Sequence, residues 1–390
     1  MKHAMLDTGR QGRGQSVSGR GQSVPPILHI ITGLGFGGAE RLLFNIASES
    51  VAAGQSILVV SLLPGGEFRP LFEAAGIEVV DLGMRRRRLS LSGLLRFVSI
   101  LRARNPILLQ AWLYHANLLA LAGLLLSGRR QQTTLLWGVY CTELPVSHYH
   151  WTLAPVRWLN ARLSWLTDGV IYNARRSQDF HRAIGFREPR SLLLANSVNI
   201  ERFKPSCELR REVRREMNIP QDAVVVIAVA RVDPMKDWPN LMTAVRPLRN
   251  VITLAIGKGT EALPAQKGFV RIGARDDVHR LLAATDIYVL SSAFGEAQSV
   301  ALTEAMACGL PVVATDVGDA AFLVTGAGIV VPPNDAVALS AAIDSLARDP
   351  SLRETLGAAA RARIVVSHSA RKIHETLQCA YAGSAVRHGP

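Results

Sequence analysis

The chain has 390 residues, 48% of them hydrophobic, and a formal net charge of +13. This length and apolar content predict a globular protein with two domains and exclude a chain that is disordered throughout. Its four cysteines have neither metal-ligand nor C-x-x-C spacing, which predicts free thiols in a reducing compartment rather than a disulfide framework.

Residues 1–26 differ in composition from everything that follows. They are rich in Gly, Ser, Gln and Arg, and the sequence GRGQSV occurs at 12–17 and again at 19–24. Such a segment cannot bury a core, and it lacks the apolar stretch of a signal peptide. We therefore predict a disordered tail before the first domain, and no transmembrane segment in the chain.

The first domain, predicted over residues 27–205, opens with an apolar strand at 27–32 and a Gly-rich turn. Gly33, Gly35 and Gly38 satisfy the pattern G-x-G-x-x-G, which raises the possibility of a dinucleotide site. The second strand, 57–62, is not followed by the acid that such a site uses to bind a ribose hydroxyl. A tight turn in a different kind of site is the better interpretation.

The elements that follow alternate between strands and helices, as in a doubly wound parallel sheet. Predicted strands are 77–81, 107–113, 133–139 and 170–173, and predicted helices are 91–102, 117–127 and 174–183. His115 directly follows the strand at 107–113, so we expect it to face the crevice at the carboxyl edge of the sheet.

Basic residues gather around the helix at 91–102. The run Arg85–Arg88 precedes it, and Arg96, Arg102 and Arg104 lie on or beside it. Arginines next to apolar residues suit peripheral contact with anionic lipid, and a solvated basic face is the alternative. We expect a cytoplasmic protein, with the inner face of the cell membrane as the place of that contact.

The second domain, predicted over residues 206–390, begins with a buried strand at 223–230, and its last helix is a candidate to pack back on the first domain. The loop after this strand places Arg231 and Lys236 on either side of an Asp233-Pro234 turn signal. Two cations that converge at the carboxyl end of a strand suit a diphosphate, whereas an ordinary solvated turn is the alternative.

The stretch 284–318 combines a strand, an acidic loop and a helix that Ser299 can cap. A helix that starts at the carboxyl end of a parallel strand directs N–H groups into the crevice, where phosphate binds. Glu296 and Glu304, spaced as E-x7-E, accept hydrogen bonds only, so their natural partners beside a phosphate are sugar and ribose hydroxyls. The alternative is that both acids are merely solvated.

The whole unit resembles the donor-site signature of the family 4 glycosyltransferases, which are retaining enzymes with the GT-B fold, an α/β architecture of two Rossmann-like domains facing a central cleft. The resemblance covers nearly all of residues 27–380. It implies transfer of a sugar from a nucleotide diphosphate sugar to a hydroxyl acceptor, with lipid-linked acceptors among the options and bacterial surface polysaccharide or glycolipid synthesis as the setting. No cofactor and no metal are implied, and no D-x-D metal site occurs in the sequence.

The resemblance also implies roles for individual residues. Glu296 would contact the transferred sugar and Glu304 the nucleotide ribose, while Arg231 and Lys236, in the family's R-x4-K element, would neutralise the diphosphate. His115 would lie near the sugar. Further donor contacts would come from backbone groups: Gly37 and Gly38 of the GGAE loop, Ser299 and Val300 at the helix start, and Ile272 near the base.

Two departures from the family pattern bear on specificity. The Gly-Phe-Pro that usually follows the first acid is replaced by Ala297, Gln298 and Ser299, and the polar Gln298 is expected to alter which sugar is accepted. A histidine that many members carry after the strand at 133–139 is absent, since the chain has Tyr140 there.

Two other functions stay open at this point. A nucleotide-sugar epimerase shares the architecture, and a basic protein without chemistry could bind nucleic acid or another polyanion. The tail offers arginine and glycine, but the chain has no aromatic interleaving, and an acidic pair in the crevice would repel a polyanion. Nucleic acid is therefore not the expected partner.

Overall fold

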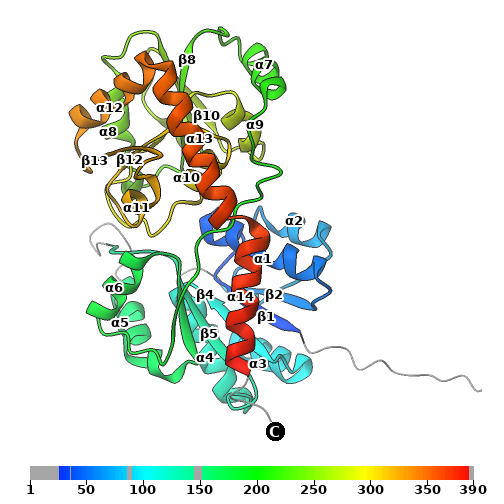
Figure 1. The fold of residues 1–390 in the computed structure, drawn as a ribbon. Helices are drawn as coiled ribbons and strands as arrows, with labels where there is room; N and C mark the ends of the chain where they lie inside the picture. Colours follow the sequence, from blue (N-terminus) through cyan, green and yellow to red (C-terminus); the bar gives the residue numbers. More distant parts are fainter. Residues whose placement is uncertain (1–25, 36, 86–89, 145–151, 386–390) are drawn as a thin grey trace, which may run out of the picture.

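The computed structural model describes residues 26–35, 37–85, 90–144 and 152–385. Residues 1–25 of the predicted disordered tail and Arg86–Arg88 of the basic run thus lie outside the described residues. Two α/β domains are stacked on one another, with the N-terminal domain below and the C-terminal domain above in Figure 1. This arrangement confirms the predicted two-domain GT-B architecture.

The N-terminal domain contains a seven-stranded sheet in the order β3-β2-β1-β4-β5-β6-β7, and all its strand pairs are parallel. Helices cover both faces of this sheet, so its central strands read as apolar runs. The strands are β1 (Ile27–Ile31), β2 (Ile57–Ser61), β3 (Glu78–Asp81), β4 (Leu108–Trp112), β5 (Thr134–Val139), β6 (Gly169–Tyr172) and β7 (Ser191–Leu193).

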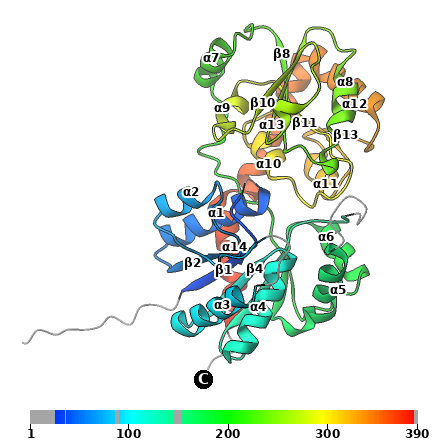
Figure 2. The same cartoon turned by 180° about the vertical axis from the view of Figure 1, so that it is seen from behind.

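One face of this sheet packs against α1 (Gly38–Ala52) and α2 (Arg69–Ala74). The other face is covered by α3 (Leu91–Arg104), α4 (Tyr114–Ser127) and α5 (Leu153–Leu163), which lie toward the viewer in Figure 2. The short helix η2 (Ser164–Leu166) follows α5, and α6 (Arg175–Ala183) follows β6.

The C-terminal domain contains a six-stranded parallel sheet in the order β10-β9-β8-β11-β12-β13. Its strands are β8 (Val224–Val229), β9 (Val251–Ile256), β10 (Phe269–Gly273), β11 (Ile287–Leu290), β12 (Val312–Thr315) and β13 (Gly328–Val331). Its helices are α7 (Cys207–Glu216), η3 (Pro234–Lys236), α8 (Trp238–Val245), η4 (Thr260–Ala262), α9 (Val278–Ala283), α10 (Val300–Ala307), α11 (Ala320–Val324), α12 (Ala336–Arg348) and α13 (Pro350–Ser367).

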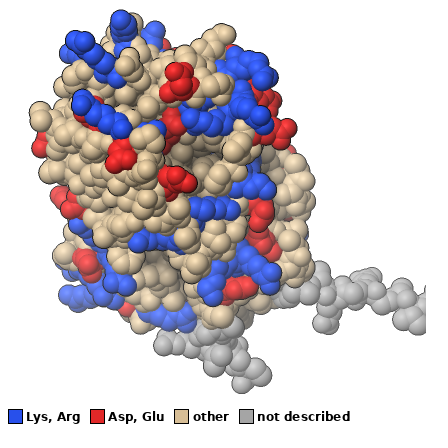
Figure 3. Space-filling view, turned by 45° about the horizontal axis from the view of Figure 1, so that its top comes forward, with Lys and Arg blue, Asp and Glu red and all other residues tan. Residues whose placement is uncertain are grey.

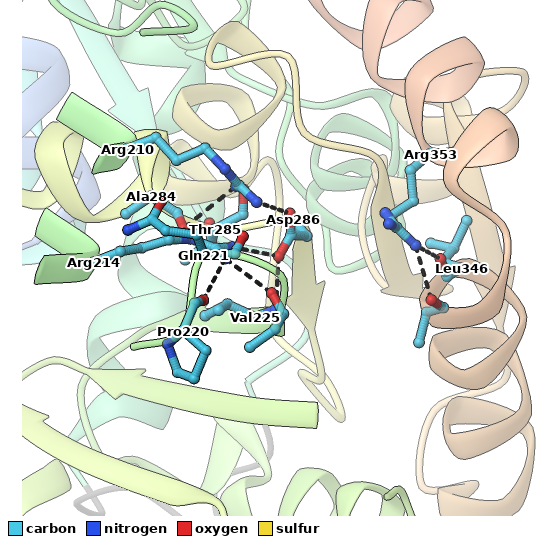
Figure 4. Close-up of polar contacts among 12 residues, drawn as sticks. Arg210, Arg214, Pro220, Gln221, Val225, Ala284, Thr285, Asp286, Leu346 and Arg353 are labelled. Carbon is cyan, nitrogen blue, oxygen red and sulfur yellow. Dashed lines mark hydrogen bonds and ion pairs between the residues drawn. The ribbon is translucent and has the colours of Figure 1, made fainter. Parts of the chain in front are cut away.

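A buried arginine ties α7 to the sheet of this domain (Figure 4). The Arg214 side chain is fully buried, pairs with Asp286 at 2.7 Å, and donates hydrogen bonds to four backbone carbonyls. Asp286 also accepts from Arg210 at 2.7 Å and from the amide of Val225 at 2.7 Å. Because the charges of Arg214 and Asp286 are both compensated by partners, their burial is tolerated. These contacts also fix the residue that precedes β11.

The last described helix, α14 (Ala370–Ala385), returns to the N-terminal domain (Figure 1). Its residues Ile373, Leu377 and Tyr381 belong to the same apolar cluster as Leu42 and Ile46 of α1. Where the chain crosses back, Val198 and Ser369 form a parallel bridge, so the two interdomain connections lie side by side. None of the helices in the described ranges is long and apolar enough to cross a membrane.

Candidate functional site in the interdomain cleft

A cavity of about 440 Å³ lies between the two domains, where the carboxyl ends of both sheets face each other. Its lining includes eight of the ten predicted site residues, namely Gly37, Gly38, Arg231, Lys236, Glu296, Ser299, Val300 and Glu304. A larger hollow of about 860 Å³ lies at the opposite edge of the C-terminal sheet, beside the first residues of β8 and β9, and none of the predicted site residues lines it. The interdomain cavity is therefore the candidate site.

Lys236 and Glu296 come from two different loops and form an ion pair at the centre of the site. Asp233 shapes the first loop by accepting from the amide of Met235 at 3.0 Å, which starts η3. In the second loop, Oε1 of Glu296 also accepts from Ser292 Oγ at 2.8 Å. The sequence placed both residues at strand ends, and the fold brings their charges together.

Arg231 lies on the same wall of the cavity and is about half exposed, with its guanidinium paired to Asp233 Oδ2 at 2.9 Å. The opposite wall carries Glu40. Burial raises the pKa of the Glu40 carboxyl to about 7, although the positive charge of Arg231 opposes the shift. The cavity thus contains an acid that can gain or lose its charge near neutral pH.

Two helices begin at the cavity from opposite sides. Ser299 caps α10 by accepting from the amide of Leu302 at 3.4 Å, whereas α1 begins after Gly37 without a side-chain cap. A Cβ atom on Gly38 would lie 3.2 Å from Cγ2 of Val300, so glycine lets the two helix starts approach closely. Both positive helix ends therefore face one small volume, which favours a bound anion.

Glu304, in the second turn of α10, is buried and lies across the cleft from Arg41 of α1, with 3.7 Å between Oε1 and Nε. Burial raises the pKa of the Glu304 carboxyl, and Arg41 opposes this shift. Sequence reasoning missed Arg41. The sequence feature that could have indicated Arg41 is its position in the first turns of the helix that follows the Gly-rich loop.

The N-terminal domain also holds the acidic loop in place. The amide and Oγ1 of Thr142 donate to the carbonyls of Gly295, at 3.2 Å, and Glu296, at 2.8 Å. Gly295 has a φ of 78°, and a Cβ atom there would lie 2.7 Å from the sulfur of Met235. Glycine is thus required by both the backbone and the packing, and the position of Glu296 depends on both domains.

Gln298 connects the acidic loop to both interdomain connections. Its Oε1 accepts from the Asn196 amide at 2.5 Å, and its backbone carbonyl accepts from Asn196 Nδ2 at 2.7 Å. Its Nε2 lies 3.3 Å from Nε2 of His368, whose pKa is lowered to about 4 by burial. The neutral ring can accept at this nitrogen, so Gln298 joins both crossing segments to the cavity.

Two predicted residues, His115 and Ile272, are not among the described residues that line the cavity. His115 is exposed in the first turn of α4, because this helix starts at Tyr114 rather than at 117 as predicted. Leu113 lines the cavity instead, with a φ of 73° that turns the chain directly from β4 into α4. Ile272 packs against the core of its domain, and the cavity is reached two residues later, at Ala274.

Other lining residues lacked a clear signal in the sequence. Tyr140 and Asn173 follow β5 and β6 of the N-terminal sheet, while Lys258 and Arg275 follow β9 and β10 of the C-terminal sheet. All four lie at carboxyl ends of strands, where side chains of an open parallel sheet meet a ligand. Lys258 and Arg275 add positive charge beside Arg231 and Lys236.

Comparisons with known proteins indicate the family and the fold. The family model described as "Glycosyltransferase Family 4" matches residues 36–202, and the model described as "Glycosyl transferases group 1" matches residues 210–363. The fold resembles that of Anabaena HepE, solved in complex with UDP and glucose, with a TM-score of 0.79 and 22% identity over 91% of this chain and 99% of that one.

Curated relatives match over a shorter stretch. The D-inositol 3-phosphate glycosyltransferase of Kribbella flavida is 30% identical over 188 residues, which are 42% of this chain and 44% of the relative. The lipopolysaccharide core biosynthesis glycosyltransferase LpsE of Rhizobium meliloti is 33% identical over 184 residues, 44% of this chain and 50% of the relative. The chain thus spans about half the length of the curated relatives it matches.

Proposed function

The chain belongs to glycosyltransferase family 4, and we propose that it transfers a sugar from a nucleotide diphosphate sugar to a hydroxyl group with retention of anomeric configuration and without a metal ion. The observation that carries this proposal is the convergence of Arg231, Lys236, Glu296 and two helix N-termini on one interdomain cavity. These groups supply both a diphosphate site and acceptors for sugar hydroxyls.

The diphosphate would lie between the starts of α1 and α10, within reach of Arg231 and Lys236. When the bond from the sugar to the diphosphate breaks, negative charge develops on the leaving phosphate oxygen. Fixed cations and helix ends stabilise this charge most strongly in a cleft that excludes water. Lys236 would then divide its interaction between the phosphate and Glu296.

The two acids would accept hydrogen bonds from the donor on either side of the phosphates. Glu296, held by Ser292 and by Thr142 of the other domain, would contact the transferred sugar. Glu304, deep in the cleft beside Arg41, would contact the ribose. The similarity to LpsE favours an acceptor in lipopolysaccharide or a related surface glycan.

A panel of nucleotide diphosphate sugars in a thermal-shift assay would identify the donor first. The matching donor should raise the Tm of the wild type and of Lys372→Ala, an exposed control on α14, but not that of Lys236→Ala. Labelled donor with candidate acceptors should then give a glycoside in the presence of EDTA. Release of an epimerised donor without any acceptor would identify an epimerase, and no response to any donor would contradict the proposal.

A further inference from the structure

We propose that Glu40 binds the donor diphosphate as a neutral carboxylic acid, by donating a hydrogen bond to a phosphate oxygen, so that donor binding takes up a proton. This role rests on the proposed function, because it concerns the same cavity. Glu40 lies in the first turn of α1 and lines the cavity together with two other acids, Glu296 and Glu304. Those two have proposed partners among the sugar hydroxyls, whereas Glu40 has none.

The Glu40 side chain folds back over the start of its own helix. A Cβ atom on Gly37, the residue before α1, would collide with Oε2 of Glu40, so the carboxyl group lies directly against the helix N-terminus. Its own backbone amide is a hydrogen-bond partner of this carboxyl group. Gly37 has no side chain that could cap the helix. Glu40 therefore occupies the place at the start of α1 where an incoming phosphate would bind.

Charged groups from both domains surround this carboxyl group. Glu67, which precedes α2, disfavours the ionised form of Glu40, and Arg231 favours it from across the cleft. The other charged side chains of the cavity wall are Arg41, Lys236, Lys258, Arg275, Glu296 and Glu304. Tyr140 and Cys141 also line the cavity and stay neutral, because burial raises the pKa of both groups. For Glu40, burial outweighs the cations and raises the pKa to about 7, so a neutral carboxyl group is accessible near neutral pH.

Carboxyl groups on the outer surface of the protein have different surroundings. On the face shown in Figure 3, acidic and basic side chains are interspersed and in contact with solvent, which favours their ionised forms. The Glu40 carboxyl group instead lies in a cleft, with an acid of its own domain nearby. Its ionised form therefore has weaker support, and an anionic ligand weakens that support further.

A bound donor would bring negative charge next to Glu40. A diphosphate that is esterified at both ends is fully ionised near neutral pH, so it has no proton of its own to share. A like charge at close range raises the pKa of a carboxyl group. A carboxylate can only accept hydrogen bonds and would repel the phosphate, whereas the neutral acid can donate to it. The complex therefore holds a proton that the free protein holds only part of the time.

Isothermal titration of the whole chain with UDP-glucose and with GDP-mannose tests the proposal. Titrations at about pH 8 in HEPES and in Tris measure the proton uptake, because these buffers differ in ionisation enthalpy. The nucleotide sugar that binds should take up about half a proton or more per molecule of the wild type. Its Kd should be nearly constant below pH 7 and should rise above pH 7 by up to about tenfold per pH unit.

Two substitutions of Glu40 separate its charge from its hydrogen bond. Glu40→Gln keeps an N–H donor, so it should bind the nucleotide sugar without proton uptake, and at about pH 8 at least as tightly as the wild type. Glu40→Ala should also lose the proton uptake but bind about fivefold more weakly than Glu40→Gln, because the hydrogen bond is lost. Glu354→Gln, at an exposed position on α13, is the control and should behave like the wild type. Melting curves without donor verify the fold of each variant.

Two outcomes would overturn this role while the proposed function stands. One is donor binding to the wild type without proton uptake. The other is proton uptake that persists in Glu40→Gln, which would assign the proton to another group such as Glu304, whose pKa is also raised by burial. If no nucleotide sugar of the thermal-shift panel binds to the wild type at any pH, the proposed function fails, and the role of Glu40 fails with it.

Discussion

Lys236 and Glu296 form an ion pair between the loop that follows β8 and the loop that precedes α10. Each side chain is less than one-seventh exposed, so each charge depends on the other for compensation. The same two residues are proposed to contact the diphosphate and the sugar. Their pairing therefore couples the stability of the site to its chemistry.

Replacement of Lys236 by Ala should lower kcat by about a hundredfold or more, because a fixed positive charge on the leaving phosphate is lost. The variant also leaves the Glu296 carboxylate without its partner, so its Tm should fall. Adding Glu296→Gln should restore much of the Tm but not the activity. Steady-state kinetics and calorimetry on the single and double variants measure both effects, and near-normal turnover in Lys236→Ala would contradict the assignment.

Gly38→Ala should weaken donor binding by about tenfold, because the added Cβ meets Val300 across the cleft and holds the two helix starts apart. The double variant with Val300→Ala removes the opposing methyl groups and should recover most of the affinity. Isothermal titration with the donor measures both. Equal loss in the single and double variants would show that the close approach of α1 and α10 is unimportant.

Gln298→Phe, which introduces the residue usual in the family, should destabilise the protein by about 1–3 kcal/mol, since the Asn196 amide loses its acceptor in a buried position. Amide hydrogen exchange should accelerate in both interdomain connections, around Asn196 and around His368. Gln132→Ala, at an exposed position, is the control. Unchanged exchange at both connections would mean that Gln298 does not couple them to the cavity.

Glu40→Gln should change how stability depends on pH. The folded state raises the pKa of this carboxyl from 4.5 to about 7, so the folded protein binds more protons than the unfolded chain between these values. Stability of the wild type therefore contains a favourable contribution below pH 4.5 that is lost as the pH rises through 7. As the pH rises from 4.5 to 7, the Tm of the wild type should therefore fall relative to the Tm of the variant. Parallel pH profiles of the two proteins would contradict the prediction.

The doubly wound folds and most of the site could be predicted because both follow from local sequence. Strands buried on two faces are apolar runs, and ligand residues such as Arg231 and Glu296 come directly after them. The first helix turn of α10 was also predictable, since Ser299 precedes an apolar segment that ends at Gly309. The positions of these residues after a strand or before a helix carried this information, whereas Gly37, Gly38 and Val300 came from the family resemblance.

The rest depends on contacts between residues far apart in the chain. Thr142 holds the carbonyl of Glu296 from 154 positions away, and nothing near either residue signals the bond. Leu113 adopts a positive φ, which leucine disfavours, so no sequence rule would place it there. This turn also explains why His115 is exposed on α4 rather than facing the cavity, as the sequence suggested.

The return of α14 to the N-terminal domain has a consequence for folding during synthesis on the ribosome. The apolar cluster that contains Leu42 of α1 is closed by Ile373, Leu377 and Tyr381, and Gln110 of β4 accepts from the hydroxyl of Tyr381. The N-terminal domain is translated first, but its apolar core is covered only after α14 has been made. All elements of the C-terminal domain are present once α13 has emerged. We therefore expect the C-terminal domain to finish folding before the N-terminal domain, although it is translated second.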